Sequence, residues 1–372
     1  MGLKLKLLGS GGFGRVYELT DYSHVVVKKV KLYPSDDKDF ILREVTMLRQ
    51  VCKQRSDDYK KISPCRSQAI ASFVGCILDK NVIYEFHEKM TWDFANSSIR
   101  DSYLRLKPYK RVIVMLDIID RFIELHKLKI VHSDIKPQNI MLKSKDFSEI
   151  RIIDLGLANF EGKDFLGGTE GFRPPETYSS SKKGKILRFA NDVFALGMTL
   201  AGMEGDFSYA ISLIQKGCFR VKEDINFCSD MIDMGLRNAF SIDKGLGSIF
   251  SVISQAVDSS LNNRFDSMEK FSDELLKKFK KLDGAESFIK VLVDDSQKVE
   301  SPGTFQSYWR NKLIGKKEPP KSPVVEPSEG IFERIIRFFT CGSKKPKKNK
   351  KYIVAIPIDN RKKEAISKKI IL

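Results

Sequence analysis

The stretch IVHSDIKPQNIML at Ile130–Leu142, followed by IIDLGLA at Ile152–Ala158, carries the most chemically specific pattern in the chain. Asp134, Asn139 and Asp154 supply two carboxylates and one amide from two segments that are close in sequence. Oxygen ligands of this kind suit Mg²⁺ and leave coordination positions open for phosphate oxygens and water. Asp134 can also accept the proton of an incoming hydroxyl. The pattern is typical of a phosphoryl-transfer site.

A glycine-rich run, LGSGGFGRV at Leu8–Val16, lies near the N-terminus. Residues without a Cβ atom let backbone N–H groups approach phosphate oxygens closely. By itself the run is weak support, because glycine clusters are common in loops. The candidate phosphate-binding residues are Gly9, Ser10, Gly11, Gly12, Phe13 and Gly14.

Three further runs complete the pattern: HVVVKKV with Lys28, DFILREVTMLRQV with Glu44, and GTEGFRPPE at Gly168–Glu176. With the two segments above, and in the same order along the chain, they resemble the motifs of eukaryotic-type protein kinases. The resemblance implies an α+β, bilobal protein kinase fold with a small β-rich N-lobe and a larger α-helical C-lobe. It also implies that the ligands are ATP and Mg²⁺, with Asn139 and Asp154 at the metal.

The resemblance assigns Lys28 to the α and β phosphates of ATP, and Glu44 to an ion pair that holds this lysine. Lys29 is a competing candidate, but neighbours on a strand point to opposite faces, so only one of the two faces the site. Glu44 lies in a predicted amphipathic helix, whose apolar positions are Phe40, Ile41, Val45, Leu48 and Val51. The alternative for Glu44 is a solvated residue of that helix.

The strand NVIYEFHEKM is expected to border the adenine pocket. By resemblance, Tyr84 is the bulky residue at the back of the pocket, and residues from Glu85 to His87 offer backbone groups to the purine. Three apolar side chains are expected to sandwich the ring: Val16, Val26 and Met141. These residues fit equally well as plain core residues.

In GTEGFRPPE, Thr169 is expected to hydrogen-bond Asp134 and Lys136 and to shape the acceptor pocket. Lys136, two residues after the catalytic aspartate, adds a positive charge near the transferring phosphate. A lysine at this position resembles serine/threonine kinases, and Thr169 points the same way. Arg264 falls where the family pattern places the partner of Glu176.

Two departures from the family pattern occur. Ser133 replaces the arginine of HRD, the group that usually binds a phosphorylated activation loop, so activation by loop phosphorylation is not expected. Leu155 replaces the phenylalanine of DFG and keeps an apolar side chain beneath Asp154 and His132. We expect these side chains to stack with Leu48 between the two lobes.

The main functional hypothesis is a serine/threonine protein kinase, whose protein substrate the sequence does not identify. The alternative is a pseudokinase scaffold that binds a protein partner or a nucleotide without turnover. A kinase of small molecules or lipids is disfavoured, because GTEGFRPPE resembles the peptide-positioning segment of protein kinases.

Composition agrees with a globular protein of the cytoplasm. Hydrophobic residues make up 42% of the 372 residues, which is enough for substantial cores. The six cysteines have no CxxC spacing, which is typical of free thiols in a reducing compartment. No apolar run approaches the roughly 18 residues that a membrane-spanning helix needs. The N-terminal MGLKLK lacks a secretory signal and matches the N-myristoylation pattern poorly.

The domain boundaries follow composition. The kinase domain is predicted at 1–280, with an N-lobe at 1–83 and a C-lobe at 88–280. A helical extension that contains Trp309 follows at 281–313 and is expected to pack on the large lobe, and a proline-rich linker follows at 314–330. The final predicted unit is an amphipathic helix with a polybasic tail at 331–372.

The segment 331–351 combines the apolar helix face of IFERIIRFFT with Cys341 and the basic run KKPKKNKK. An apolar face, a thiol that can be acylated and a polybasic run favour a reversible anchor on an anionic membrane surface. Nuclear import or nucleic-acid contact is an alternative for the basic run. Docking on the kinase lobe and a solvated end are the remaining alternatives.

Overall fold

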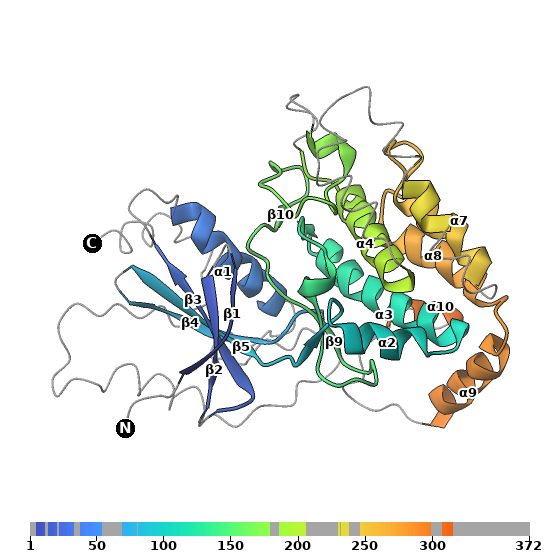
Figure 1. Cartoon of the computed structure of the whole chain (residues 1–372), viewed down its shortest axis with the longest axis horizontal. Helices are drawn as coiled ribbons and strands as arrows, with labels where there is room; N and C mark the ends of the chain where they lie inside the picture. Colours follow the sequence, from blue (N-terminus) through green and yellow to red (C-terminus); the bar gives the residue numbers. More distant parts are fainter. Residues whose placement is uncertain are drawn as a thin grey trace.

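The chain folds into two lobes that lie side by side (Figure 1). The computed structural model describes residues 5–11, 14–20, 22–32, 38–53, 69–79, 81–178, 186–205, 230, 232–237, 246–298 and 307–314. The small lobe consists of a sheet and one helix, and the large lobe is mainly helical. The predicted α+β bilobal fold is therefore confirmed.

Five strands form the antiparallel sheet of the small lobe, in the order β1, β2, β3, β5, β4. They are β1 (Leu5–Gly11), β2 (Gly14–Leu19), β3 (Val25–Lys31), β4 (Phe73–Asp79) and β5 (Val82–Glu88). The valines of β3 suit a central strand, because β-branched side chains pack well on a pleated surface. Val25 and Val27 are buried, whereas Val26 and Lys28 are partly exposed. The face that carries Lys28 is therefore the open one.

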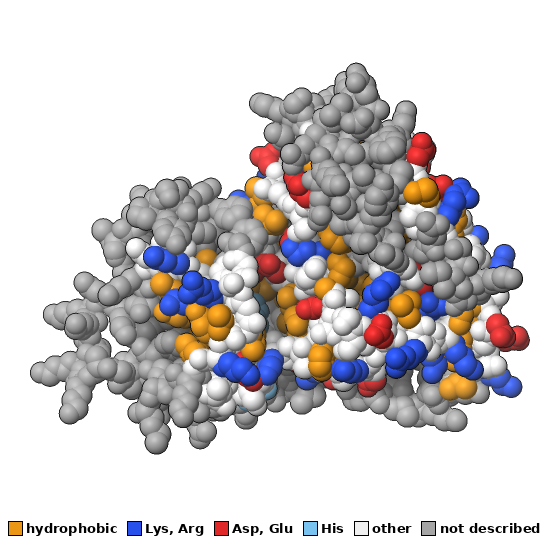
Figure 2. Space-filling view, viewed as in Figure 1, with side chains coloured by type: hydrophobic (Ala, Val, Ile, Leu, Met, Phe, Trp, Pro, Cys, Tyr) orange, Lys and Arg blue, Asp and Glu red, His pale blue; other side chains and the backbone are white. Residues whose placement is uncertain are grey.

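Strand β1 lies at the edge of this sheet and pairs with β2. Its apolar side chains are exposed, with Leu5 at 47%, Leu7 at 55% and Leu8 at 45%. Figure 2 shows exposed hydrophobic side chains over this part of the small lobe. Because β1 buries so little surface, its position depends on its hydrogen bonds to β2.

Helix α1 (Lys38–Lys53) packs beside the sheet through the predicted apolar face. Val45, Leu48 and Val51 are buried in the main core. Burial of one stripe orients the rest of the helix, so Glu44 points toward the sheet side. The helix thus positions Glu44 near β3.

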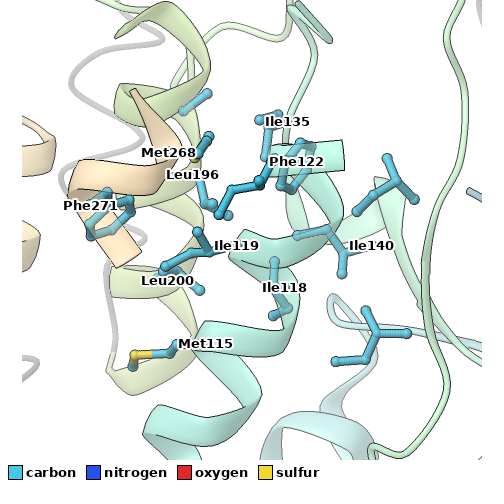
Figure 3. Close-up of a cluster of buried hydrophobic side chains, with 14 of the residues drawn as sticks. Met115, Ile118, Ile119, Phe122, Ile135, Ile140, Leu196, Leu200, Met268 and Phe271 are labelled. Carbon is cyan, nitrogen blue, oxygen red and sulfur yellow. The ribbon is translucent and has the colours of Figure 1, made fainter. Parts of the chain in front are cut away.

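The centre of the large lobe is helix α3, which is surrounded by other helices (Figure 3). The helices are α2 (Ser97–Leu104), α3 (Pro108–Lys127), α4 (Phe189–Glu204), α7 (Gly247–Ala256) and α8 (Met268–Phe279). Met115, Ile119 and Phe122 of α3 are fully buried, and they lie among side chains of α4 and α8. Gly197 lets α4 pack closely on the end of α7, since a Cβ atom there would lie 2.7 Å from a methyl group of Val257.

Short strands and 3₁₀ turns flank the loops that contain Asp134 and Asp154. They are β6 (Trp92–Asp93), β7 (Ile130–Val131), η1 (Pro137–Asn139), β8 (Ile140–Leu142), β9 (Ile150–Ile152), β10 (Asn159–Phe160) and η2 (Pro175–Tyr178). Strand β8 pairs with β6 and β9, and β7 pairs with β10. Asp134 therefore lies between β7 and β8, and Asp154 lies between β9 and β10. These pairings bring the two motif loops together.

Two helices extend the large lobe beyond α8, within the predicted extension: α9 (Ala285–Lys298) and α10 (Tyr308–Leu313). Trp309 is fully buried, as expected for a side chain that packs on this lobe. Its Nε1 donates to Asp117 Oδ1 of α3 at 2.8 Å. Ser307 Oγ donates to Asp120 Oδ2 at 2.5 Å. Helix α10 is therefore joined to α3 by packing and by buried hydrogen bonds.

Apart from Ile314, the predicted linker and the predicted tail lie outside the described residues. The membrane, nuclear and docking interpretations of the tail stay predictions. Among the helices that the structure describes, none is both long and apolar enough to cross a membrane.

Candidate functional site

Lys28 and Glu44 form an ion pair between the sheet and α1. Lys28 Nζ lies 2.7 Å from both carboxylate oxygens of Glu44. The competing residue, Lys29, points to the other face, where its Nζ lies 5.8 Å from the centre of the Tyr84 ring. The alternation of β3 therefore turns Lys28 toward the cleft between the lobes.

Lys28 also connects the two lobes, because its Nζ lies 3.0 Å from Asp154 Oδ1. Asp154 adopts a left-handed backbone conformation with φ of 65°, which is unfavourable for a residue with a side chain. Burial acts to raise the pKa of Asp154, but the positive charge of Lys28 outweighs it and lowers that pKa. Asp154 is therefore ionised at neutral pH.

Asp134 lies at the centre of a hydrogen-bonded group. Lys136 Nζ donates to Asp134 Oδ2 at 2.8 Å, and Asn139 Nδ2 donates to the Asp134 carbonyl oxygen at 2.8 Å. Burial acts to raise the pKa of Asp134, but hydrogen bonds from Lys136 and Thr169 outweigh it and hold that pKa below its usual range. The carboxylate is charged and ready to accept a hydrogen bond from a hydroxyl.

Thr169 links the activation segment to this group. Its backbone N–H and its hydroxyl both donate to Asp134 Oδ1, at 2.8 Å and 2.6 Å. Lys136 Nζ lies 2.7 Å from the hydroxyl oxygen. The close approach requires Gly168, since a Cβ atom there would lie 2.7 Å from the Ser133 carbonyl oxygen. The structure thus brings Asp134, Lys136 and Thr169 together.

The conformation of the catalytic loop depends on Asp192 at the start of α4. Asp192 is fully buried, and it accepts hydrogen bonds from the backbone N–H of His132 at 2.8 Å and of Ser133 at 2.9 Å. Ser133 has a φ of 71°, a strained value for serine. His126 Nε2 lies 3.0 Å from the same carboxylate. Asp192 therefore holds the strained turn that precedes Asp134.

The activation segment ends at a second buried contact. Arg264 NH1 and NH2 donate to the carboxylate of Glu176, at 2.9 Å and 3.2 Å. The side chain of Arg264 has no exposed surface, and that of Glu176 is 11% exposed. This buried pair attaches the end of the segment to the large lobe.

Three buried side chains join the lobes beneath the site. Leu48 of α1, His132 and Leu155 are 3%, 0% and 1% exposed. His132 packs edge-on against Phe122 of α3, with ring centres 5.9 Å apart. An apolar residue at 155 thus keeps the buried position that the family gives to phenylalanine.

The back of the nucleotide pocket differs from the sequence prediction. The sequence predicts Tyr84 at the back of the pocket, and this prediction is wrong. The Tyr84 side chain packs against a small core cluster of the N-lobe sheet that contains Phe86. Glu85 pairs directly with Lys28, and His87 pairs with Val26, so Glu85 and His87 point to the cleft side. The sequence did not reveal this, because alternation fixes faces only once the register between two strands is known.

The remaining predicted contacts are placed as follows. Val16, Val26 and Met141 are partly exposed and lie outside the buried core clusters, as side chains that line a pocket would be. In the glycine-rich turn, Gly9, Ser10, Gly11 and Gly14 belong to β1 and β2, whereas Gly12 and Phe13 lie outside the described residues. At Gly14 the backbone has a φ of 145°, and a Cβ atom would lie 2.5 Å from the Lys29 carbonyl oxygen.

Asn139 and Asp154 fit a magnesium ion by their chemistry and orientation. Asn139 turns its Nδ2 toward Asp134, which directs its Oδ1 elsewhere. In the described part of the chain, the Asp154 carboxylate meets Lys28 and the Gly156 N–H through Oδ1, which leaves Oδ2 for a cation. Two protein oxygens suit Mg²⁺, which commonly keeps phosphates and water as its other ligands.

A two-lobed domain with these paired motifs has the architecture of a protein kinase. The sequence pattern described as "Protein kinase domain" matches residues 3–220, which is more than half of the chain. The chain therefore belongs to the eukaryotic-type protein kinase family.

Individual relatives show the same similarity at low identity. Wall-associated receptor kinase 1 of Arabidopsis thaliana is 29% identical over 210 residues, which cover 52% of this chain and 26% of that protein. The serine/threonine-protein kinase dkf-2 of Caenorhabditis briggsae is 27% identical over 215 residues, which cover 55% and 16%. Myosin light chain kinase family member 4 of Homo sapiens is 24% identical over 211 residues, which cover 54% and 50%. The chain thus spans half or less of the length of these relatives.

Proposed function

We propose that the protein is a serine/threonine protein kinase that transfers the γ-phosphate of ATP to a protein hydroxyl. The observation that carries the proposal is the contact of Thr169 with Asp134 at 2.6 Å, beside the bridge from Lys28 to Asp154 at 3.0 Å. Asp134 and Thr169 would receive the hydroxyl, and Lys28 and Asp154 would receive the phosphates. Both pairs lie in the cleft between the lobes.

The carboxylate of Asp134 would orient the attacking hydroxyl and accept its proton. Lys136, 2.8 Å from Asp134 Oδ2, is placed to stabilise negative charge on the phosphoryl group as it moves. Lys28, held by Glu44, would hold the nucleotide phosphates. Asn139 and Asp154 would hold Mg²⁺, which supplies the positive charge that offsets the phosphates.

A serine or threonine acceptor is favoured by two neighbours of Asp134. Thr169 and Lys136 both contact the Asp134 carboxylate directly. The short side chain of Thr169 and the ammonium group of Lys136 therefore border the acceptor site on that side. The relative dkf-2 is named as a serine/threonine-protein kinase, and its similarity to this chain supports the same preference.

We further propose that activity does not require phosphorylation of the activation segment. From Leu155 to Gly168 the sequence contains no serine, threonine or tyrosine. Backbone bonds hold the segment instead: Gly162 N–H donates to the Leu187 carbonyl at 2.9 Å, and Leu187 N–H donates to the Lys163 carbonyl at 2.8 Å. Phosphatase treatment should therefore leave the rate unchanged, and a large loss of rate would contradict the proposal.

The proposal is tested by transfer from γ-labelled ATP with Mg²⁺ to a generic protein acceptor. Asp134→Asn keeps the size of the side chain and should lower kcat by about 10³-fold while nucleotide binding persists. Asp101→Asn makes the same chemical change at an exposed position of α2 and serves as the matched control. Phosphoamino-acid analysis of the product distinguishes serine and threonine from tyrosine.

Nucleotide binding without transfer by the native chain would replace the kinase proposal with the pseudokinase scaffold. Efficient phosphate transfer to small alcohols and none to proteins would favour a small-molecule kinase.

The membrane role of 331–351 is a separate proposal that rests on the sequence. Deleting these residues should release the protein from anionic vesicles, and unchanged binding would refute it.

A further inference from the structure

A buried carboxylate lies beside Lys28 at the back of the site. Glu85 of β5 is the direct partner of Lys28 in the antiparallel pairing of β3 and β5. Directly paired residues point to the same face of a sheet. The side chain of Glu85 is 1% exposed, so little water screens its charge.

The two faces of β5 show that Glu85 has no alternative direction. Ile83, two residues earlier, belongs to the core cluster that contains Leu48 of α1. Tyr84 and Phe86, on either side of Glu85, belong to the cluster on the opposite face. The register of the sheet therefore fixes Glu85 on the side of α1 and the cleft.

Glu85 acts electrostatically on both members of the ion pair. Burial acts to lower the pKa of Lys28, but the negative charges of Glu44, Asp154 and Glu85 raise it above its usual range. The pKa of Glu44 is raised first by burial and next by the negative charge of Glu85, while the ammonium group of Lys28 at 2.7 Å opposes the rise. In the described part of the chain, the ammonium group of Lys28 thus has more carboxylates around it than its single positive charge can balance.

A nucleotide adds the negative charge of its phosphates to this environment. Three carboxylates, those of Glu44, Glu85 and Asp154, already act on Lys28. His87 follows two residues after Glu85 on β5, and its Nε2 lies 3.5 Å from Glu85 Oε2. The phosphates must therefore compete with Glu85 for the charge of Lys28, unless a cation enters with them.

We propose that Glu85 is a positioning residue that acts through Lys28. Its negative charge weakens the binding of phosphates by Lys28 when no metal is present, and nucleotide binding therefore depends on a divalent cation. This inference rests on the proposed function, because it assumes that Lys28 meets nucleotide phosphates. The sequence predicts that the backbone of Glu85 meets the purine, but Glu85 is paired on both sides, with Lys28 of β3 and Cys76 of β4, so we assign its side chain to the phosphate end of the ligand.

The test compares three probes on the full chain by calorimetry: ADP with EDTA, ADP with Mg²⁺, and adenosine, which has no phosphate. Glu85→Gln should bind metal-free ADP about tenfold more tightly than the native chain, the order expected when one buried charge near a polyphosphate is removed. Adenosine affinity should stay within about twofold, since a neutral ligand does not respond to the charge. The ratio of metal-free to Mg²⁺-bound dissociation constants should fall severalfold.

Two variants control for structural effects. Glu85→Asp keeps the charge and should retain the native dependence on metal. Glu88→Gln makes the same change on the same strand, at a carboxylate that binds Lys143 Nζ at 2.9 Å, and should leave all three affinities unchanged.

Unchanged metal-free ADP binding in Glu85→Gln would overturn the inference. An equal shift for adenosine would overturn it as well, because it would assign Glu85 to the base. If the native chain fails to bind ADP even with Mg²⁺, the proposed function fails first. Native binding with no response to Glu85→Gln removes this inference alone.

Discussion

Thr169 donates two hydrogen bonds to one oxygen of Asp134, from its backbone N–H at 2.8 Å and from its hydroxyl at 2.6 Å. Thr169 of the GTEGFRPPE motif and the residue proposed as the proton acceptor are thus parts of one hydrogen-bonded unit. Because Asp134 is charged and mostly buried, the loss of either donor leaves a carboxylate that is less well oriented.

Thr169→Ala removes the hydroxyl donor and keeps the backbone N–H. We expect kcat to fall by about 10- to 100-fold with little change in KM for ATP, because the residue contacts Asp134 and not Lys28. Thr169→Ser keeps the hydroxyl and should retain most of the activity. Steady-state kinetics measures both, and equal losses in the two variants would contradict the assigned role.

Gly168→Ala places a methyl group 2.7 Å from the Ser133 carbonyl oxygen, which is too close for a carbon and an oxygen that are not bonded. The activation segment must move, and Thr169 must move with it. We expect kcat to drop at least as far as in Thr169→Ala, with the melting temperature nearly unchanged. Gly162→Ala, where a Cβ atom meets nothing within 4 Å, separates crowding from backbone effects, although its φ of 82° adds strain of its own.

Arg264→Ala should destabilise the large lobe by about 3 to 5 kcal/mol, because the carboxylate of Glu176 would be left without its buried partner. Arg264 also donates to the carbonyl oxygens of Asp258 and Ala190, at 2.9 Å and 3.1 Å. Denaturant unfolding measures the loss. The control is Lys277→Ala, which breaks an exposed pair with Glu274 and should cost less than about 1 kcal/mol. Similar losses for both would count against the importance of burial.

Asp120 gives the stability a pH dependence that can be isolated. Burial raises its pKa to about 7, while the hydrogen bond from Ser307 opposes the rise. An acid whose pKa is higher in the folded state than in the unfolded chain stabilises the fold most at low pH. Its contribution is present below the unfolded value, near 3.8, and is lost as pH rises toward 7.

Asp120→Asn should therefore become more stable than the native chain as pH increases from 4 to 8, by an amount on the order of a few kcal/mol at the upper end. The measurement is the difference in melting temperature between variant and native chain across that range. Titrating groups that do not interact with Asp120 affect both proteins equally, whereas the neighbouring carboxylate of Asp117, whose charge acts on Asp120, is part of the measured difference. A difference that stays constant with pH would show that Asp120 is not protonated in the folded protein.

The sequence predicted the residues whose spacing along the chain is short and fixed. Asp134 and Asn139 lie on one loop, and Asp154 lies just beyond the next hairpin, so local order was sufficient to place them in one site. The choice of Lys28 over Lys29 followed from the resemblance to the kinase motifs, because alternation along the strand shows only that one of the two faces the site. Glu85 was not predicted to face the site, because its direction depends on the register of β3 with β5.

Contacts between distant segments were beyond reach for the same reason. Trp309 was expected to pack on the large lobe, but its partner Asp117 is separated from it by 192 positions. No periodicity connects two such segments, because the contact depends on how α3, α8 and α10 pack in three dimensions. The sequence alone therefore does not show that Asp117 and Asp120 of α3 are buried, because the residues that cover them belong to the distant segment with Ser307 and Trp309.

The packing of α10 on α3 extends the folded unit well beyond the kinase motifs. The match to the protein kinase domain covers residues 3–220, whereas the buried core continues to Trp309, which has no exposed area. A fragment that ends at residue 280 would leave the carboxylates of Asp117 and Asp120 without the indole and the hydroxyl that cover them. Any attempt to produce the kinase domain alone should therefore keep the chain at least to residue 314, because α10 covers the buried carboxylates of α3.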